Sequence, residues 1–257
     1  MMNATGPCQE GPNLPERHGA GPCQEDPNLT QPASPTQASQ TILERVQTLE
    51  LPAHVRLVAV SKTFPAAAIR AAYGAGLRDF GENKIQEAIG KQLELADLTD
   101  ITWHFIGHLQ TNKARKAVQH FDWIHSVDSL KLACRLDQAA VDLSRAPTCC
   151  LQVKLLPDPN KYGWTEAELW SALPSLAQLS HLKVEGIMAI PPYGLLPTET
   201  QSFFERAYGL GQAMANHQET PLPIRYFSMG MSQDFPLAIA AGANIIRLGT
   251  TLFGSRH

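Results

Sequence analysis

The chain has 257 residues, of which 44% are hydrophobic and 18% are charged, and its formal net charge is -3. This balance is typical of a globular protein with a sizeable core, and it excludes the strongly basic surface that tracks a nucleic-acid backbone. Since no apolar stretch approaches the roughly 20 residues of a membrane-spanning helix, we expect neither nucleic acid nor a membrane as a partner.

Residues 1–40 differ in composition from the rest of the chain. They are rich in Pro, Gly, Gln, Ser and Thr and contain few large apolar side chains. Such a segment buries too little apolar surface to fold alone, so it predicts a disordered tail. One short repeat, residues 6–14 against 21–29, lies in this tail and is too brief for a repeat fold.

The five cysteines form no Cys-x-x-Cys pair. Their spacing therefore supports neither a zinc cage nor a redox site, and we predict no metal. The N-terminus has neither an apolar signal core nor the Arg-rich character of a transit peptide, so we expect a cytoplasmic protein with reduced thiols. The adjacent Cys149 and Cys150 are interpreted as small hydrophobic residues on a strand.

From residue 41 onward, short β-like runs alternate with helical patterns. A leading helix over 41–51 precedes predicted strands at 57–60, 79–80, 103–106, 123–127, 150–153, 184–188, 226–228 and 245–248. The helices predicted between them cover 65–73, 83–95, 112–119, 130–143, 165–176, 198–214 and 235–240. This alternation predicts the α/β class and a single (β/α)8 TIM-like barrel over residues 41–257.

The first predicted strand is the most apolar short run of the chain and leads to Lys62. A parallel strand of this kind is buried on both faces, and the active groups of α/β barrels come from the carboxyl ends of strands. Desolvation of an amine there favours its uncharged form, which attacks a carbonyl group. The alternative is a lysine that extends from the strand end into solvent without a chemical role.

The last predicted strand carries Arg247 and leads to Gly249 and Thr250. Because side chains alternate along a strand, Arg247 points into the barrel if Ile246 and Leu248 pack outward on the helices. A buried guanidinium there requires a partner. Gly249 and Thr250 begin a turn into a short helix, where backbone amides and the helix dipole favour a phosphate.

A second polar turn, at 228–232, follows the preceding strand and contains Ser228, Met231 and Ser232. It supplies further amides and hydroxyls to the same end of the barrel, or it is only a connecting loop with serine caps. An amine, a phosphate cradle and an inward arginine together fit a phosphorylated aldehyde held as a Schiff base. That ligand is pyridoxal 5'-phosphate.

Six blocks in this order along the chain resemble the YggS/PLPBP pyridoxal phosphate homeostasis family: residues 58–63, 80–87, 103–107, 188–191, 228–232 and 247–250. The resemblance runs from residue 41 to 256. It implies a barrel similar to the N-terminal domain of alanine racemase, fold type III of the pyridoxal phosphate proteins, with the cofactor held as a Schiff base on Lys62.

The resemblance also implies a set of cofactor-binding residues: Lys62, Asn83, Ser228, Met231, Ser232, Arg247, Gly249 and Thr250. Ser228, Gly249 and Thr250 would contact the phosphate. Arg247 would face the pyridine nitrogen, where a cation disfavours ring protonation and weakens the ring as an electron sink. Asn83 either hydrogen-bonds the oxygen side of the ring or caps the following helix.

Three other polar residues are left outside this set. The loop at 157–163 matches the family's Lys-x-Gly loop only through Lys161 and Gly163, so we interpret Lys161 as a solvated loop lysine. His108 receives no role. His104 is interpreted as a histidine that lines the barrel or its core, not as a metal ligand.

Two classes of function compete. In the first, the protein binds pyridoxal phosphate for intracellular vitamin B6 homeostasis, with pyridoxal phosphate-dependent apo-enzymes as partners. In the second it is an amino-acid racemase or decarboxylase, and racemisation needs a second base that a further domain or subunit normally supplies. We expect no such domain, and therefore a monomeric binding protein without catalytic residues. A Schiff-base aldolase with a phosphorylated substrate is a third alternative.

Overall fold

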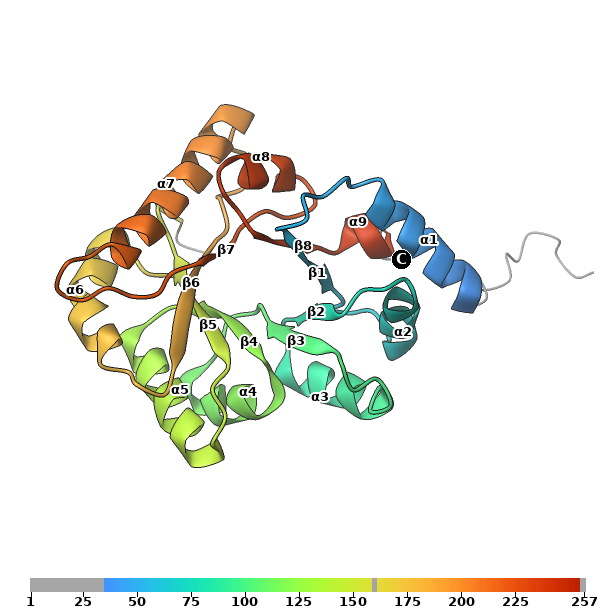
Figure 1. Cartoon of the computed structure of the whole chain (residues 1–257), viewed down its shortest axis with the longest axis horizontal. Helices are drawn as coiled ribbons and strands as arrows, with labels where there is room; N and C mark the ends of the chain where they lie inside the picture. Colours follow the sequence, from blue (N-terminus) through green and yellow to red (C-terminus); the bar gives the residue numbers. More distant parts are fainter. Residues whose placement is uncertain (1–34, 159–160, 255–257) are drawn as a thin grey trace, which may run out of the picture. The chain divides into compact units, whose positions relative to one another are not determined.

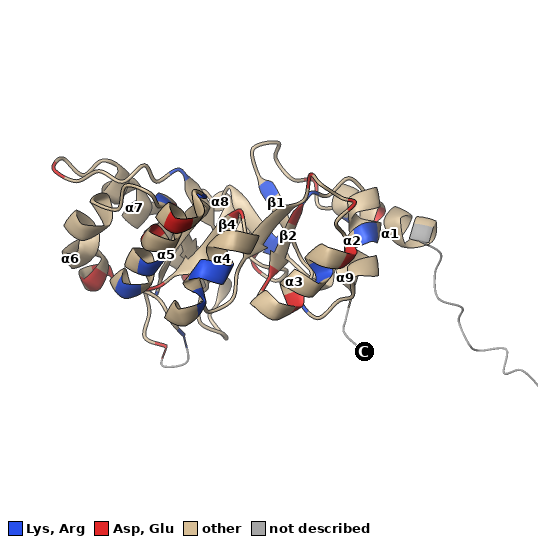
Figure 2. Cartoon of the chain, turned by 90° about the horizontal axis from the view of Figure 1, so that it is seen from below, with Lys and Arg blue, Asp and Glu red and all other residues tan. Residues whose placement is uncertain are grey.

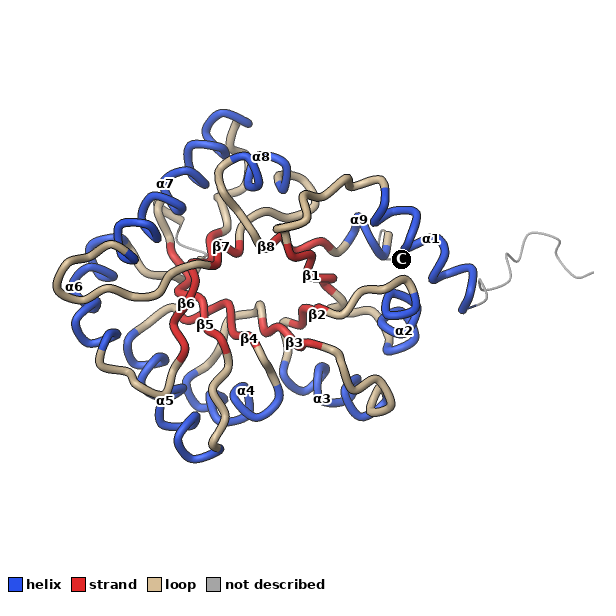
Figure 3. Tube along the Cα trace, viewed as in Figure 1, coloured by secondary structure: helices blue, strands red, loops and turns tan. Residues whose placement is uncertain are grey.

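The computed structural model describes residues 35–158 and 161–254, which lie within one compact unit, Ala33–His257. Its parallel strands form a closed barrel in which each strand pairs with its neighbours in sequence and the last pairs with the first (Figure 3). The strands are β1 (Arg56–Val60), β2 (Asp79–Glu82), β3 (Thr102–Phe105), β4 (Trp123–Val127), β5 (Thr148–Val153), β6 (Lys183–Ala189), β7 (Tyr226–Ser228) and β8 (Ile245–Leu248).

Helices surround the barrel and connect its strands (Figure 1). They are α1 (Pro35–Gln47), α2 (Ala66–Gly74), α3 (Ile85–Glu94), the 3-10 turn η1 (Thr111–Lys113), α4 (Ala114–His120), α5 (Leu130–Leu143), α6 (Glu166–Ala177), α7 (Pro197–Ala215), α8 (Phe235–Ala240) and α9 (Thr250–Phe253). The predicted (β/α)8 barrel is confirmed. The bounds of β4, β7, β8, α5 and α8 agree with the prediction, and the other strands and helices predicted after α1 differ by one or two residues at one or both ends. No bounds were predicted for η1 and α9.

The leading helix departs from the prediction, because α1 covers Pro35–Gln47 instead of 41–51. Its first turns belong to the stretch whose composition predicted disorder. Proline suits the first helical position, since its missing N–H has no partner there in any helix. The remainder of the predicted tail, residues 1–34, lies outside the described residues.

Helix α1 packs on α2 and α9, and its contact with α2 involves a residue before the predicted start. A Cβ at Gly74 would come within 2.8 Å of the Ser39 hydroxyl oxygen, so the glycine allows α1 and α2 to approach closely. Arg45 donates a hydrogen bond of 2.6 Å to the carbonyl oxygen of Leu252 in α9. These contacts join residues that are distant in sequence, so composition could not reveal them.

The apolar core has two layers. The larger one fills the space between the strands and the surrounding helices, and it includes Ile246 and Leu248. A smaller one fills part of the barrel interior with Val58, Trp123, Cys150, Met188 and Ile245. Because side chains alternate along β8, Arg247 faces the interior as predicted.

Cys149 and Cys150 are both buried on β5, which confirms their interpretation as small hydrophobic residues. Both carry free thiols. Burial raises the pKa of the Cys150 thiol to about 12, so this group is un-ionised at neutral pH and a poor nucleophile.

Candidate functional site

A cavity of about 290 Å³ opens at the carboxyl ends of β1, β7 and β8. Lys62 lines it from the exit of β1, and Arg247 lines it from β8. The complete lining is Val60, Lys62, Ile106, Ile190, Met231, Ser232, Gln233, Asp234, Arg247, Gly249 and Thr250. The barrel therefore brings together six of the predicted site residues, because all parallel strands end at the same rim.

The backbone next to Lys62 has an uncommon conformation. Thr63 has a φ of 69°, a region that β-branched residues rarely occupy. Its N–H donates to Glu87 Oε1 at 2.6 Å, and the N–H of Phe64 donates to the Ser61 carbonyl at 3.0 Å. These hydrogen bonds fix the turn and direct the segment that carries Lys62 toward the cavity.

A buried ion-pair network supports this turn from the helix side. Lys91 of α3 donates to Glu82 Oε1 at 2.7 Å, to Glu87 Oε1 at 2.7 Å and to the Ser61 carbonyl at 2.9 Å. The Ser61 hydroxyl donates to Glu82 Oε1 at 2.6 Å. The sequence motifs gave no reason to expect Lys91 here, because its helical position has no chemical signature.

Burial and hydrogen bonding act in opposite directions on the two carboxyl groups of this network. Burial raises the pKa of Glu82, and the hydrogen bonds from Lys91 and Ser61 offset only part of that effect. Burial also acts to raise the pKa of Glu87, but the hydrogen bonds from Lys91 and the Thr63 amide prevail and lower it. The ammonium of Lys91 thus lies between two carboxyl groups of unequal acidity.

Gly230 shapes the turn after β7. It has a φ of +91°, and a Cβ there would lie 2.8 Å from Ala238 Cβ and 2.9 Å from the backbone of Phe235, so another residue would be strained and crowded. The N–H of Met231 donates to Asp234 Oδ1 at 2.6 Å, which closes the turn. Met231 and Asp234 are thereby held at the cavity wall.

Gly249 and Thr250 also line the cavity. Helix α9 begins at Thr250, and the N–H groups of Leu252 and Phe253 both donate to the Gly249 carbonyl, at 3.0 and 2.9 Å. The predicted turn into a short helix is therefore present. The first amides of this helix lie beside the cavity, where an anion would be stabilised.

Arg247 is 4% exposed and lies at the inner end of the cavity. Its Nη1 donates to the Ser228 carbonyl at 2.5 Å and to the Ser228 hydroxyl at 2.6 Å, and its Nη2 donates to the Ala189 carbonyl at 3.3 Å. These contacts are the partners that a buried guanidinium requires. Burial lowers the pKa of Arg247 to about 10, so the side chain is a cation at neutral pH.

Two predicted site residues lie apart from this cavity lining. Ser228 is fully buried beneath Arg247, where its hydroxyl contacts Arg247 and His125. Asn83 lines a neighbouring hollow of about 640 Å³ next to α3, and its buried Oδ1 has no hydrogen-bond partner among the described residues. The alternative cap role of Asn83 is not observed, because Lys84 occupies the N-cap of α3 and makes no side-chain cap.

The remaining polar residues singled out from the sequence lie as follows. His104 is fully buried inside the barrel, as expected. His108 stacks on Tyr162 with ring centroids 3.5 Å apart, and its Nδ1 lies within hydrogen-bond distance, 3.1 Å, of Asp128 Oδ2. In the described part of the chain, no cluster of three or more His, Cys, Asp or Glu side chains is arranged to hold a metal ion.

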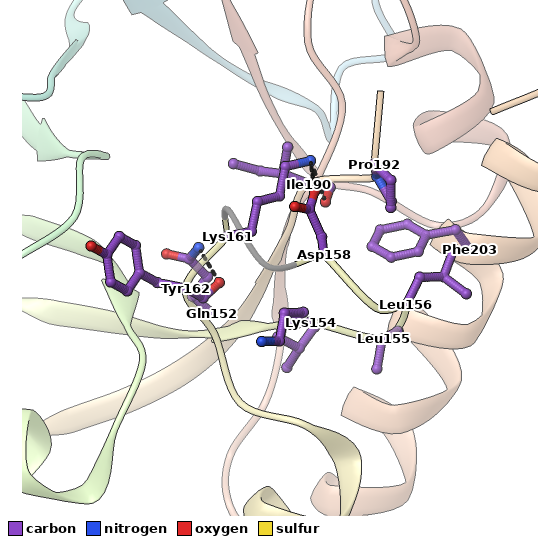
Figure 4. A pocket seen from close by; sticks show the side chains of 11 residues that line it. Gln152, Lys154, Leu155, Leu156, Asp158, Lys161, Tyr162, Ile190, Pro192 and Phe203 are labelled. Carbon is purple, nitrogen blue, oxygen red and sulfur yellow. Dashed lines mark hydrogen bonds and ion pairs between the residues drawn. The ribbon is translucent and has the colours of Figure 1, made fainter. Parts of the chain in front are cut away.

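Lys161 corrects the interpretation as a solvated loop lysine. Its side chain is only 28% exposed, and its Nζ donates to the Pro191 carbonyl at 2.5 Å and lies 3.6 Å from Asp158 Oδ2. Figure 4 shows Lys161 pointing toward Ile190 and Asp158 in a small hollow. Lys161 also lines a larger hollow that shares Ile190, Met231, Gln233 and Asp234 with the Lys62 cavity. The carbonyl groups that follow β6 stabilise the ammonium, an interaction that a loop sequence does not reveal.

Known proteins match this barrel along most of its length. The family model of the alanine racemase N-terminal domain covers residues 38–257. Alanine racemase from E. faecalis has the same fold at 22% identity, with a TM-score of 0.62 over 85% of this chain and 58% of that chain. The fold and the cavity that contains Lys62 define a barrel of the alanine racemase N-terminal class.

Closer relatives narrow this class to one family. The pyridoxal phosphate homeostasis protein of Synechocystis is 54% identical over 80% of this chain and 94% of its own, and that of Escherichia coli K12 is 40% identical over 80% and 87%. PipY of Synechococcus elongatus, solved with pyridoxal phosphate bound, is 55% identical with a TM-score of 0.80 over 83% of this chain and all of PipY. The chain belongs to the pyridoxal phosphate homeostasis protein family, as its sequence blocks indicated.

Proposed function

We propose that this protein binds pyridoxal 5'-phosphate as a Schiff base on Lys62 and acts in intracellular vitamin B6 homeostasis. One observation carries the proposal: a single cavity joins Lys62, the cationic Arg247 and the turn at Gly249 and Thr250. These groups match the aldehyde, the pyridine ring and the phosphate of that cofactor. The PipY structure with pyridoxal phosphate bound, at 55% identity, supports the same proposal.

The residues present fit the cofactor in size and in charge. The cavity of about 290 Å³ is close to the lower limit for a small-molecule site, as suits a compact ligand. Ser232, Gly249 and Thr250 would bind the phosphate through backbone amides and hydroxyls, and Met231, whose N–H is taken by Asp234, would contact the cofactor with its side chain. Asn83 lines a separate hollow, where its unpartnered Oδ1 leaves an acceptor for a ligand group or for water.

Arg247 would face the pyridine nitrogen. The bound cofactor supplies an electron sink whose strength depends on protonation of that nitrogen. A guanidinium can only donate hydrogen bonds, so it leaves the nitrogen unprotonated and the sink weak. We assign Ser228, which the resemblance places on the phosphate, to the support of Arg247 instead, because the buried hydroxyl bonds the guanidinium at 2.6 Å.

Titration of the full chain with pyridoxal phosphate tests this function. We expect saturable binding with a visible absorption band. Pyridoxal without its phosphate should bind at least about tenfold more weakly, because charge-assisted hydrogen bonds to the turn are lost. Failure to bind pyridoxal phosphate, or equal affinity for pyridoxal, would refute the assignment.

We also propose that the protein turns over amino acids negligibly, which separates it from a racemase or decarboxylase. The cation at Arg247 leaves the pyridine a poor electron sink, so carbanions are weakly stabilised. Incubation of the loaded protein with a panel of L-amino acids, followed by chiral analysis and measurement of released CO₂, provides the test. Sustained turnover that disappears in Lys62→Ala would favour the enzyme alternative.

We propose a monomer in the cytoplasm whose partners are pyridoxal phosphate and the apo-enzymes that use it. Within the described segments, no helix has the length and apolarity to cross a bilayer. Acidic and basic residues are interspersed over the helices in Figure 2, and the net charge is -3, which speaks against nucleic-acid binding. Faster loading of an added apo-enzyme from this protein than from the free cofactor pool would support delivery over storage.

A further inference from the structure

A chain of buried polar side chains crosses the barrel interior below Arg247. The Ser228 hydroxyl of β7 lies 2.7 Å from His125 Nδ1 of β4, and His125 Nε2 lies 2.9 Å from His104 Nδ1 of β3. His104 Nε2 in turn lies 2.9 Å from Asp79 Oδ1 of β2. This series of hydrogen-bonded side chains therefore connects the cavity to the opposite end of the strands.

All the inner members of this chain are shielded from water. His104, His125 and Ser228 are fully buried, whereas the Asp79 side chain is 22% exposed at the start of β2. Burial lowers the pKa of both histidines, so both rings are neutral at pH 7. A neutral imidazole donates through one nitrogen and accepts through the other.

This rule gives every hydrogen bond a direction. The Asp79 carboxylate only accepts, so His104 carries its proton on Nε2 and accepts at Nδ1. His125 must then donate from Nε2 to His104 and accept at Nδ1 from the Ser228 hydroxyl. The Ser228 oxygen accepts from Arg247, which has only donors. This leaves the Ser228 proton free to be donated to His125, so with the direction set at Asp79 every bond points from Arg247 toward Asp79.

We infer that Asp79 is the remote counter-ion of Arg247 and that Ser228, His125 and His104 are positioning residues that transmit its charge to the guanidinium. In the described part of the chain, no carboxylate forms an ion pair with Arg247. A buried cation is costly without compensation, and hydrogen bonds aligned in a low dielectric polarise one another.

Other charged groups near these side chains do not replace the connection between Asp79 and Arg247. Arg56 of β1 lies 3.5 Å from Asp79 Oδ1 and holds the carboxylate from the outer side. Asp122 and Arg56 influence His104 through space, and Asp234 of the cavity wall favours the charged form of Arg247. Among the residues that the structure describes, only Ser228, His125 and His104 form a continuous series of hydrogen bonds from the guanidinium to a carboxylate. This series of hydrogen bonds would hold Arg247 charged and oriented toward the pyridine ring. The orientation toward the ring rests on the proposed function.

The tautomers of the two histidines test the inference in the unaltered protein. ¹⁵N NMR of the full chain, without and then with pyridoxal phosphate, should show His104 and His125 neutral at pH 7 and protonated on Nε2. A proton on Nδ1 of either ring, or a charged ring, would overturn the inference. Because this measurement does not require the cofactor, its outcome is separate from that of the cofactor titration.

Asp79→Asn tests the role of the counter-ion. An amide can donate to His104 Nε2, so His104 should shift toward the Nδ1-protonated tautomer, and the dissociation constant of pyridoxal phosphate should rise about tenfold. The visible band of the bound cofactor should also shift. Asp97→Asn is the matched control, because Asp97 is exposed and pairs only with Arg70 in the described chain. Unchanged tautomers and unchanged affinity in Asp79→Asn would contradict the inference.

Discussion

Lys62→Ala is expected to abolish covalent attachment of pyridoxal phosphate and the visible absorption band that accompanies it. Lys62 is the lysine that lines the cavity with Arg247 and Thr250, and alanine has no amine to form a Schiff base. Weak noncovalent binding should persist, because the turns at Met231 and Gly249 are unchanged. Absorption spectra of both proteins after saturation with cofactor provide the measurement.

Lys161→Ala is the matched control for this experiment. Lys161 also lies near the carboxyl ends of the strands, but it lines a different hollow and donates to the Pro191 carbonyl. The control should retain the covalent band. Borohydride reduction followed by peptide mapping identifies the attachment site directly, and a pyridoxyl group on a lysine other than Lys62 would disprove the assignment.

Lys91→Met should destabilise the fold by about 3–5 kcal/mol at neutral pH. Methionine preserves much of the side-chain volume but removes the cation that pairs with the fully buried Glu82 and with Glu87. An isolated buried carboxylate is strongly unfavourable. Urea denaturation gives the change in free energy of unfolding. Lys116→Met, a change on the exposed face of α4, should lie within about 0.5 kcal/mol of the parent.

The pH dependence of this variant has a defined sign. Burial already raises the pKa of Glu82 in the folded state, and loss of Lys91 removes a group that lowers it. The raised folded pKa means that the folded state holds its proton at pH values where the unfolded chain has already lost it, so the deficit should be small below the ordinary pKa of a glutamate. It should grow as the pH rises from there and level off above the folded pKa. A Glu82→Gln/Lys91→Met double variant should recover most of the loss. A deficit that does not change between acidic and neutral pH would contradict the buried-pair explanation.

The barrel and much of its site followed from local sequence patterns. Apolar runs of strand length that alternate with helical periodicity predict repeated βα units, and β4, β7 and β8 lie where those runs lie. Lys62, Arg247 and Gly249 could be placed at one rim for the same reason. Parallel strands in a barrel share a direction, so residues that follow different strands meet at one end.

Other features depended on contacts that closure of the barrel creates. The hydroxyl of Ser228 meets His125, 103 residues earlier in the chain, only because β7 and β4 face each other across the interior. Lys91 reaches Glu82 and the turn beside Lys62 because α3 packs on that side of the sheet. The part of α1 that precedes the predicted start contacts α2, where Gly74 approaches Ser39.

The division has a simple physical basis. Strand and helix periodicity, turn residues and strand ends are local properties, so a linear sequence displays them. They were sufficient to predict the fold class and to place Lys62, Gly249 and Thr250 in the site. The partners of a buried polar group are chosen by geometry across the core, where the low dielectric makes an unpaired group costly. For this reason only the folded barrel revealed Asp79, His104 and His125 behind Arg247, and the separation of Asn83 and Ser228 from the cavity.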